Sequence, residues 1–312
     1  MKGSLQGLAA SLLIALSGFM LSFIHPSLDA LAISIIFGML VGNILKETEV
    51  LQKGINLSIG IFLPIGIALY GSQLQLSDVE PIKILYIFLT FISVFTLMYV
   101  FTRIFGCRNN TSLLIATGMS VCGASAIAIV SPLIEADREE TSISLIVITI
   151  VGLIGMMFYP IAGFYLHYSA GQYALLTGAT LPMLGQVKVA SMNFSEEILP
   201  ISLKYKLIRM SFLVFIITVV IVLSGIKRKR FYAPWFVIVF ICLAFLVNVF
   251  DLSSFTRYLA PVSSFSLCTA LASIGLSVDF DSITERGFSP LVSTFVVFSI
   301  IYTTFYILFT MI

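Results

Sequence analysis

Residues 198–226 read ILPISLKYKLIRMSFLVFIITVVIVLSGI, a stretch that is apolar enough to cross a bilayer except at Lys206 and Arg209. A transmembrane helix needs about 20 mainly apolar residues, and a charge at its centre costs at least about 2.5 kcal/mol on insertion scales. Arg209 lies roughly 16 Å from the N-terminal end of the stretch, which is near mid-depth in the bilayer. Both cations therefore need a partner inside the protein.

Lys206 and Arg209 are three residues apart, so their side chains lie on one face of the predicted helix. They can share a water-filled cavity, bind backbone carbonyl groups or bind an anion. Alternatively, Lys204 and Lys206 extend to the headgroups, which leaves Arg209 alone to be explained. Lys188, near the end of the preceding apolar stretch, is a third candidate cation. We predict that Arg209, Lys206 and Lys188 bind a small anionic substrate.

The whole chain has the composition of an integral membrane protein. Of its 312 residues, 59% are hydrophobic and 10% are charged, which exceeds the apolar share of soluble domains. No dyad alternation indicates membrane strands, and the first apolar stretch lacks a cleavage site, so we expect it to be retained. We predict one all-α transporter domain, residues 1–312, embedded in the lipid bilayer. Apolar periodicity and breaks predict about eleven spans, at 6–24, 28–45, 54–73, 83–102, 112–134, 142–166, 172–192, 198–226, 233–250, 259–279 and 288–311.

The short loops predict the orientation, because Lys and Arg accumulate on the cytoplasmic side of a membrane. A cytoplasmic N-terminus places only Lys83, Arg138 and Arg257 on the outer side. We predict a multi-pass protein of the inner (cytoplasmic) membrane whose C-terminus is outside. The basic residues are thus explained by the orientation of the chain in the membrane, and nucleic acid is not an expected partner. The inner side collects Lys2, Lys46, Lys53, Arg103, Arg108, Lys227, Arg228, Lys229, Arg230 and Arg286.

The sequence gives little support to an enzyme, a metal site or a cofactor. Its four cysteines have no paired spacing, and it has no metalloprotease, nucleophile-elbow or ATP-binding motif. Carriers of sodium ions or protons commonly place a carboxylate near mid-depth, whereas the acidic residues here cluster at span ends. A cation/proton antiporter is therefore the weaker reading. These acidic residues are Glu135, Asp137, Glu139, Glu140, Glu196 and Glu197.

The predicted span 112–134 contains many small residues, two of which are the helix-weakening glycines Gly118 and Gly123. A helix that breaks between Cys122 and Ser125 would offer backbone N–H groups and a hydroxyl to an anion, as helix N-termini do for phosphate. We predict helix breaks at Gly118 and Gly123, and substrate contacts from Cys122, Gly123 and Ser125. Ordinary packing of small residues is the alternative.

Several motifs occur together along the chain. They are GMSVCGASAIA at 118–128, the pair Glu139-Glu140, GLIGMMFYP at 152–160, KLIR at 206–209 and GLSVD at 275–279. With this set, the sequence resembles the YeiH-type membrane proteins, a family named for sulfate export, over nearly its whole length. The family is similar to the superfamily of bile-acid symporters and cation/proton antiporters. The resemblance implies an N-terminal helix followed by two inverted five-helix repeats, at 28–166 and 172–312, with crossing discontinuous helices.

Two pairings of the repeats stay open. In the first, the fifth span matches the tenth, and Gly275 is expected at a second helix break. In the second, residues 69–78 resemble residues 272–281, which would match the third and fourth spans with the tenth and eleventh.

The chain departs from the family pattern at one place. Where relatives usually read ASIHEVAQV, this chain has ATLPMLGQV at residues 179–187. Pro182 and Met183 thus replace a protonatable His-Glu pair, which changes the expected proton coupling or substrate choice. Pro182 can itself break the seventh span, because proline lacks an N–H and clashes with the preceding turn. Gln186, which is kept, is expected to contact the substrate.

The residues and the resemblance together predict a secondary active transporter that exports a small anion, similar to sulfate or a sulfonate. A proton or sodium ion is the expected coupling ion, and a homodimer is left open. Two alternatives remain: a sodium-coupled symporter of organic anions, and a membrane sensor or channel-like protein in which the basic pair only stabilises helix packing.

Overall fold

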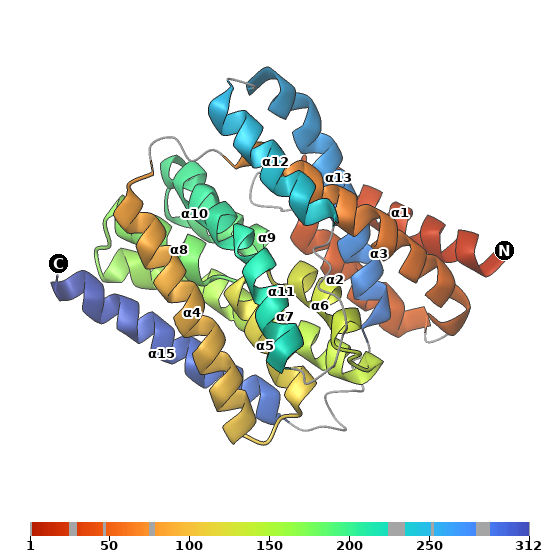
Figure 1. Cartoon of the computed structure of the whole chain (residues 1–312), viewed down its shortest axis with the longest axis horizontal. Helices are drawn as coiled ribbons and strands as arrows, with labels where there is room; N and C mark the ends of the chain where they lie inside the picture. Colours follow the sequence, from red (N-terminus) through yellow and green to blue (C-terminus); the bar gives the residue numbers. More distant parts are fainter. Residues whose placement is uncertain are drawn as a thin grey trace. The chain divides into compact units, whose positions relative to one another are not determined.

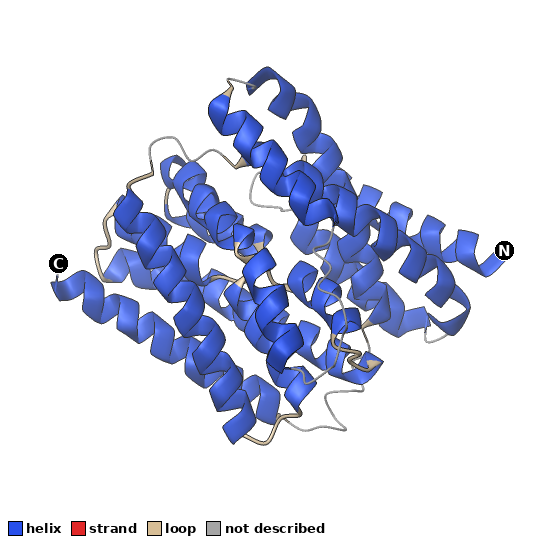
Figure 2. Ribbon diagram, viewed as in Figure 1, coloured by secondary structure: helices blue, strands red, loops and turns tan. Residues whose placement is uncertain are grey.

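The computed structural model describes residues 2–24, 30–45, 48–74, 79–223, 235–250, 253–278 and 288–311, and these are helical with short turns and no strand (Figure 2). Six helices among them are long and apolar enough to cross a membrane. The prediction of an all-α polytopic membrane protein is confirmed. Several residues used in the sequence predictions lie outside the described ranges: Lys46, Asp78, Asp279, Arg286 and the basic run at 227–230.

The chain divides into two compact units, which are described separately. The first unit comprises residues 1–78 and 229–279. Its core contains Ile14, Ile55 and Cys268 from three different helices. Its elements are α1 (Lys2–Leu21), α2 (Ala30–Leu45), α3 (Thr48–Tyr70), the 3-10 turn η1 (Gly71–Gln73), α12 (Trp235–Val249) and α13 (Ser253–Ser277) (Figure 1).

Helix α13 is continuous through Gly275, so the predicted break there is wrong. A Cβ on Gly275 would lie 2.9 Å from the Cα of Gly38, so glycine here permits α2 and α13 to approach closely. The ends of α3 and α13 are held in related ways. Asn248 donates to the Leu74 carbonyl at 2.7 Å, and Asn43 donates to the Val278 carbonyl at 3.0 Å. This similarity agrees with the second pairing, in which the third span matches the tenth.

The second unit comprises residues 79–228 and 280–312 and contains all the predicted substrate-binding residues. Helix α10 continues almost directly into α11, with only Phe212 between them. The described elements of this unit are α4 (Pro81–Ile104), α5 (Asn109–Ser120), α6 (Ala124–Leu133), α7 (Arg138–Tyr165), α8 (Ala170–Thr180), α9 (Leu184–Phe194), η2 (Glu196–Ile198), α10 (Leu199–Ser211), α11 (Leu213–Leu223) and α15 (Ser289–Met311).

Residues 109–133 fold back on themselves as a helical hairpin, which we call hairpin 1. Its limbs α5 and α6 are joined by a tip at residues 121–123. Arg108 Nη1 lies 3.4 Å from Asp137 Oδ2, whereas a straight helix would separate these residues by about 43 Å. Each limb is about half as long as the bilayer core is thick. The prediction that 112–134 crosses the membrane is therefore wrong.

Residues 170–194 form a second helical hairpin, hairpin 2, from α8 and α9 with a tip at residues 181–183. The hydroxyl of Tyr173 donates to the Ala190 carbonyl at 3.0 Å. The rings of Tyr173 and Phe194 stack with their centroids 4.0 Å apart, although a straight helix would separate these residues by about 32 Å. The predicted crossing at 172–192 is wrong for the same reason.

The two hairpins belong to opposite ends of α7. This helix has 28 residues, a length of about 42 Å that spans a bilayer. Hairpin 1 ends just before α7 begins, and hairpin 2 begins just after α7 ends. The hairpins therefore start at opposite ends of α7, and we expect them to enter the bilayer from opposite faces with their tips near mid-depth.

This topology corrects two further predictions. Within the described ranges, two helical hairpins take the place of two of the eleven predicted crossings. Residue 138 lies on the same side as residue 108, because hairpin 1 returns to the face where it began, so the assignment of Arg138 to the opposite side is wrong. The interruptions lie in the fifth and seventh predicted spans, whereas α13 in the tenth is continuous, and the pairing of the repeats stays a prediction.

Candidate functional site

The Lys206 ammonium joins the two hairpin tips. Its Nζ donates to the carbonyl oxygens of Val121 at 2.8 Å, Leu181 at 2.7 Å and Pro182 at 2.6 Å. An ammonium has three N–H donors, so these bonds use its full capacity. The side chain is fully buried, with 0% exposure. Of the three arrangements expected for this cation, the structure has the one in which it binds backbone carbonyls.

Arg209 makes the same connection one turn further along α10. Its Nε donates to the Ser120 carbonyl at 2.6 Å, Nη1 donates to the Leu181 carbonyl at 3.2 Å, and Nη2 donates to the Met119 carbonyl. Arg209 is also fully buried. The Leu181 oxygen accepts from both cations, which its two lone pairs allow. We call Lys206 and Arg209 the basic clamp.

The clamp satisfies carbonyl groups that a broken helix leaves without partners. The last carbonyls of an α-helix have no intrahelical donor, and they carry roughly half a negative charge at the C-terminus. Met119 and Ser120 end α5, and Leu181 directly follows α8. Two full positive charges thus neutralise the C-terminal ends of α5 and α8, which offsets the cost of burying both the cations and the carbonyls.

The N-terminal ends of the other two limbs also start at the tips. Gly123, the residue before α6, has a φ of +72°, a conformation that favours glycine. A Cβ on Gly123 would lie 2.7 Å from Met183 Cγ and 3.2 Å from the Pro182 oxygen, so the tips touch. The structure therefore brings Gly123 and Pro182 together, and both lie at the chain interruptions.

The other residues of the hairpin 1 tip region that were predicted to contact the substrate lie beside Gly123. The Ser125 hydroxyl donates to the Cys122 carbonyl at 3.2 Å and lies 3.2 Å from the Cys122 sulfur. Both side chains are buried, with exposures of 9% and 6%. Gly118, in contrast, lies inside α5, where a Cβ would meet the Ile127 side chain of the opposite limb at 2.9 Å. The predicted break at Gly118 is therefore wrong, because this glycine permits the limbs to pack.

Gln186 supports tip 2. Its side-chain oxygen accepts from the Met183 backbone N–H at 3.0 Å, which caps the start of α9. The amide lies against α7 at Gly152, where a Cβ would be only 2.6 Å from the Gln186 Cδ. Lys188 is on α9 and half-buried, and its side chain is not part of the clamp. Within the described ranges, no group of three or more His, Cys, Asp or Glu residues is placed to hold a metal ion.

Two buried tyrosines were not predicted from the sequence. Tyr159 of α7 shares a hydrogen bond of 2.9 Å with Thr180 at the end of α8, and Tyr173 bonds across hairpin 2. Each tyrosine hydroxyl is thus hydrogen-bonded to one limb of hairpin 2. The sequence signal was weak, because aromatic residues are common throughout apolar spans. A better signal for the hairpins was available at Arg138, since it was an exception to the charge asymmetry.

The sequence model of a family described as conserved hypothetical protein 698 matches residues 6–294. The chain belongs to this family. A UPF0324 membrane protein of Archaeoglobus fulgidus is 30% identical over 298 residues, which cover 94% of this chain and 89% of that relative. The UPF0324 inner membrane protein YeiH of Escherichia coli K12 is 28% identical over 87% of this chain and 82% of its own length.

These relatives agree with the resemblance to YeiH-type proteins, and their names identify membrane proteins. A UPF0324 membrane protein of Yersinia pestis is 29% identical and covers 96% of this chain. No solved structure matches the chain. Membership of this family therefore supports a membrane protein, and the hairpin geometry must support any more specific function.

Proposed function

We propose that the chain is a secondary active transporter that binds a small anion, similar to sulfate or a sulfonate, at the two hairpin tips. The observation that carries this proposal is the asymmetry between the helix ends at the tips. The C-terminal ends of α5 and α8 are held by Lys206 and Arg209, whereas the N-terminal ends of α6 and α9 carry no such counter-charge from the clamp.

The charge balance at the tips favours an anion. Two helix C-termini contribute roughly one negative charge in total, and two N-termini contribute roughly one positive charge. The basic clamp adds two positive charges, so the tips carry a net positive charge. Helix N-termini in a dry site bind anions through their free N–H groups, and transporters with broken helices use such ends at mid-depth.

In this proposal the basic clamp positions the site, and the ligand meets backbone N–H groups. Lys206 has no N–H left for a ligand. The N–H groups of residues 124 and 125 of α6 and of residues 184 and 185 of α9 have no intrahelical acceptor, whereas those of Ala126 and Gln186 lie against the sulfur atoms of Cys122 and Met183. The Ser125 hydroxyl and the Cys122 thiol lie beside the first set. Gln186 fixes the second set through its bond to Met183.

Opposite entry of the hairpins supports transport rather than sensing. The proposed site lies at mid-depth between two hairpins that start at opposite faces of the membrane. Movement of one hairpin can therefore open the site to one side or to the other. Gradients of protons or sodium would supply the energy. Export remains part of the proposal because of the resemblance alone.

The proposal is tested by removing one backbone N–H group at the start of α9 while the helix itself is kept. Leu184 is the first residue of α9 and follows Met183, whose φ of −108° and ψ of 148° suit a residue before proline. Proline is well tolerated at a first helical position, so Leu184→Pro deletes one N–H donor, and Leu184→Ala is the matched control.

Purified variants in proteoliposomes should be assayed for counterflow of labelled sulfate and of a small alkylsulfonate. We expect Leu184→Pro to weaken anion binding about tenfold relative to Leu184→Ala, because a hydrogen bond to a charged group contributes about 1.5–3 kcal/mol. Equal binding by the two variants would reject the tip site. Sodium-dependent uptake of an organic anion would favour the symporter, and absence of saturable flux of any anion would favour the sensor.

A further inference from the structure

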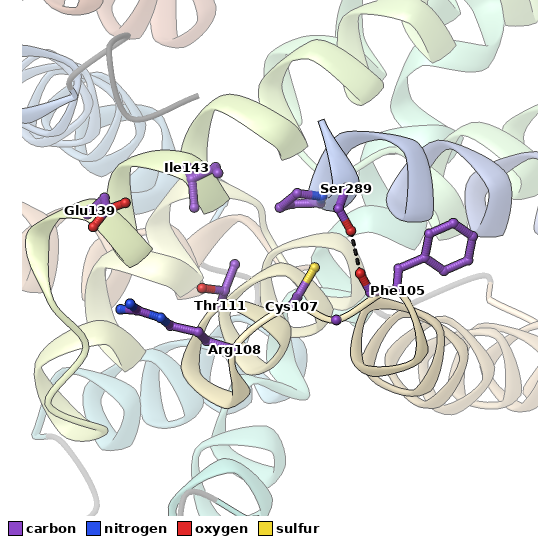
Figure 3. Close-up of a pocket in the computed structure, with 9 residues that line it drawn as sticks. Phe105, Cys107, Arg108, Thr111, Glu139, Ile143 and Ser289 are labelled. Atoms are coloured by element: carbon purple, nitrogen blue, oxygen red, sulfur yellow. Dashed lines mark hydrogen bonds between the residues drawn. The ribbon is translucent and has the colours of Figure 1, made fainter. Parts of the chain in front are cut away.

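A cavity of about 440 Å³ lies at the foot of hairpin 1, where α5 begins (Figure 3). It is walled by the turn after α4, the start of α7 and the start of α15. Its volume is within the range of small-ligand sites. The side chains that matter for its chemistry are those of Cys107, Arg108, Thr111, Glu139 and Ser289. Cys107, Arg108 and Thr111 precede the hairpin tip by about 10 to 14 positions, and Glu139 and Ser289 belong to α7 and α15, so the cavity is separate from the proposed transport site.

The helix that opens onto this cavity has no acidic cap. Arg108 precedes α5 and makes no side-chain capping bond, so the first N–H groups of this 12-residue helix, which begins beside the cavity, have no cap from the residue that precedes the helix. The neighbouring helix α7 is different, because Asp137 accepts from the Glu140 N–H at 2.6 Å and Glu140 accepts from the Asp137 N–H at 3.1 Å. The uncapped end of α5 favours an anionic group in the cavity.

Thr111 gives a second, independent observation at this cavity. Its residue exposure is 3%, and its hydroxyl oxygen is buried without a hydrogen-bond partner. A buried hydroxyl without a partner destabilises the folded protein. The hydroxyl lies on the side of Thr111 that faces Arg108 and Glu139 (Figure 3). An acceptor in the cavity would satisfy it.

The charges at the rim have both signs. The Arg108 side chain is 61% exposed and pairs with Asp137 at 3.4 Å, a solvent-screened pair that leaves several guanidinium N–H groups for another acceptor. Glu139 contributes a carboxylate to the opposite wall, and it would repel a ligand that carries only negative charge. Burial raises the pKa of the Cys107 thiol, so the thiol is neutral at neutral pH.

We propose that this cavity binds a zwitterionic phosphate ester of the phosphoethanolamine type. Its phosphate accepts from Arg108, from the Thr111 hydroxyl and from the N–H groups at the start of α5, and its ammonium donates to Glu139. The cavity lies where α4 ends and α15 begins, which is the headgroup level of a spanning helix. The source of the group is a phosphatidylethanolamine headgroup or a free molecule such as glycerophosphoethanolamine.

Native mass spectrometry of the full chain would measure which lipids stay bound after release from vesicles that contain equal parts of phosphatidylethanolamine, phosphatidylglycerol and phosphatidylcholine. We expect phosphatidylethanolamine to be retained about tenfold over the other two. Phosphatidylglycerol lacks the cation, and the quaternary ammonium of phosphatidylcholine cannot donate a hydrogen bond. Such charge-assisted bonds contribute about 1.5–3 kcal/mol.

Arg108→Gln, Thr111→Val and Glu139→Gln should each reduce that preference at least several-fold, and Lys83→Gln on α4 is the control. Thermal shift with glycerophosphoethanolamine tests the free source. A shift with this molecule, lost in the same variants, supports the site with a soluble occupant, and retention of the lipid alone supports it with a headgroup. Equal retention of the three lipids together with no thermal shift overturns the proposal, as does equal loss in Lys83→Gln.

Discussion

Hairpin 1 turns at a glycine with a positive φ, whereas hairpin 2 turns at a proline. Gly123 adopts a conformation that a side chain would strain, and Pro182 ends α8 because it lacks an N–H. The carbonyls next to both turns meet the same basic clamp on α10. Different local chemistry thus gives the same result, a pair of half-helices whose exposed carbonyls are held by cations. The clamp, rather than either turn residue, is the shared structural requirement.

The feet of the hairpins differ more than the tips. Hairpin 1 is closed at its foot by the ion pair between Arg108 and Asp137, whose side chains are 61% and 50% exposed. Hairpin 2 is closed by the stacked rings of Tyr173 and Phe194 and by a buried hydroxyl bond. Solvent screens an exposed ion pair, so hairpin 2 should be held shut more firmly.

Substitution of the clamp should have the largest effect, because it acts on both hairpins together. Lys206→Met leaves the carbonyls of Val121, Leu181 and Pro182 without that donor. We expect a loss of about 3–5 kcal/mol of stability, as for other broken buried charge networks. Thermal unfolding in detergent measures it. Lys204→Met, on the same helix and half-buried, is the control, and equal losses in the two variants would contradict the clamp.

Substitution of the turn residues should destabilise the two hairpin tips by different amounts. Gly123→Ala places a Cβ 2.7 Å from Met183 Cγ at a φ of +72°, and we expect it to destabilise the protein by about 1–3 kcal/mol. Pro182→Ala keeps the carbonyl that Lys206 binds, and we expect about 1 kcal/mol or less. Thermal unfolding of both variants tests this order. A larger loss for Pro182→Ala would show that the turn residue, not the clamp, holds tip 2.

Substitution at the feet should give the smallest effects. Tyr173→Phe removes the buried bond to the Ala190 carbonyl, which should cost about 1 kcal/mol. Arg108→Gln removes a screened ion pair, which should cost about 0.3 kcal/mol. The two melting temperatures, measured in the same detergent, give the comparison. Equal shifts would mean that the ion pair is stronger in this protein than its exposure indicates.

The sequence predicted the membrane class, the cations and the regions of both interruptions, because each depends on local chemistry. Glycine and proline signal a broken helix, and a charge in an apolar span signals a buried partner. It did not predict that the chain reverses at these points. A reversal depends on contacts such as Tyr173 with Ala190, which join residues far apart in the chain.

The site was predicted in part for the same reason. Composition identified Lys206 and Arg209, and the structure gives their partners, which are carbonyls of Met119, Ser120 and Leu181 among others. Backbone carbonyls have no sequence signature, so the side chains alone left a water-filled cavity, backbone carbonyls and an anion as alternatives. Gln186 was identified as polar, but its capping role depends on the turn at Met183.

Cysteine accessibility measures the opposed hairpins most directly. Single cysteines would replace Arg108 and Glu135 at the ends of hairpin 1, and Gly171 and Asn193 at the ends of hairpin 2, in a chain whose four native cysteines are serine. An impermeant maleimide is then applied to each face of sealed vesicles. We expect positions 108 and 135 to be labelled from one face, and positions 171 and 193 to be labelled from the other. Labelling of positions 108 and 135 from opposite faces would contradict it.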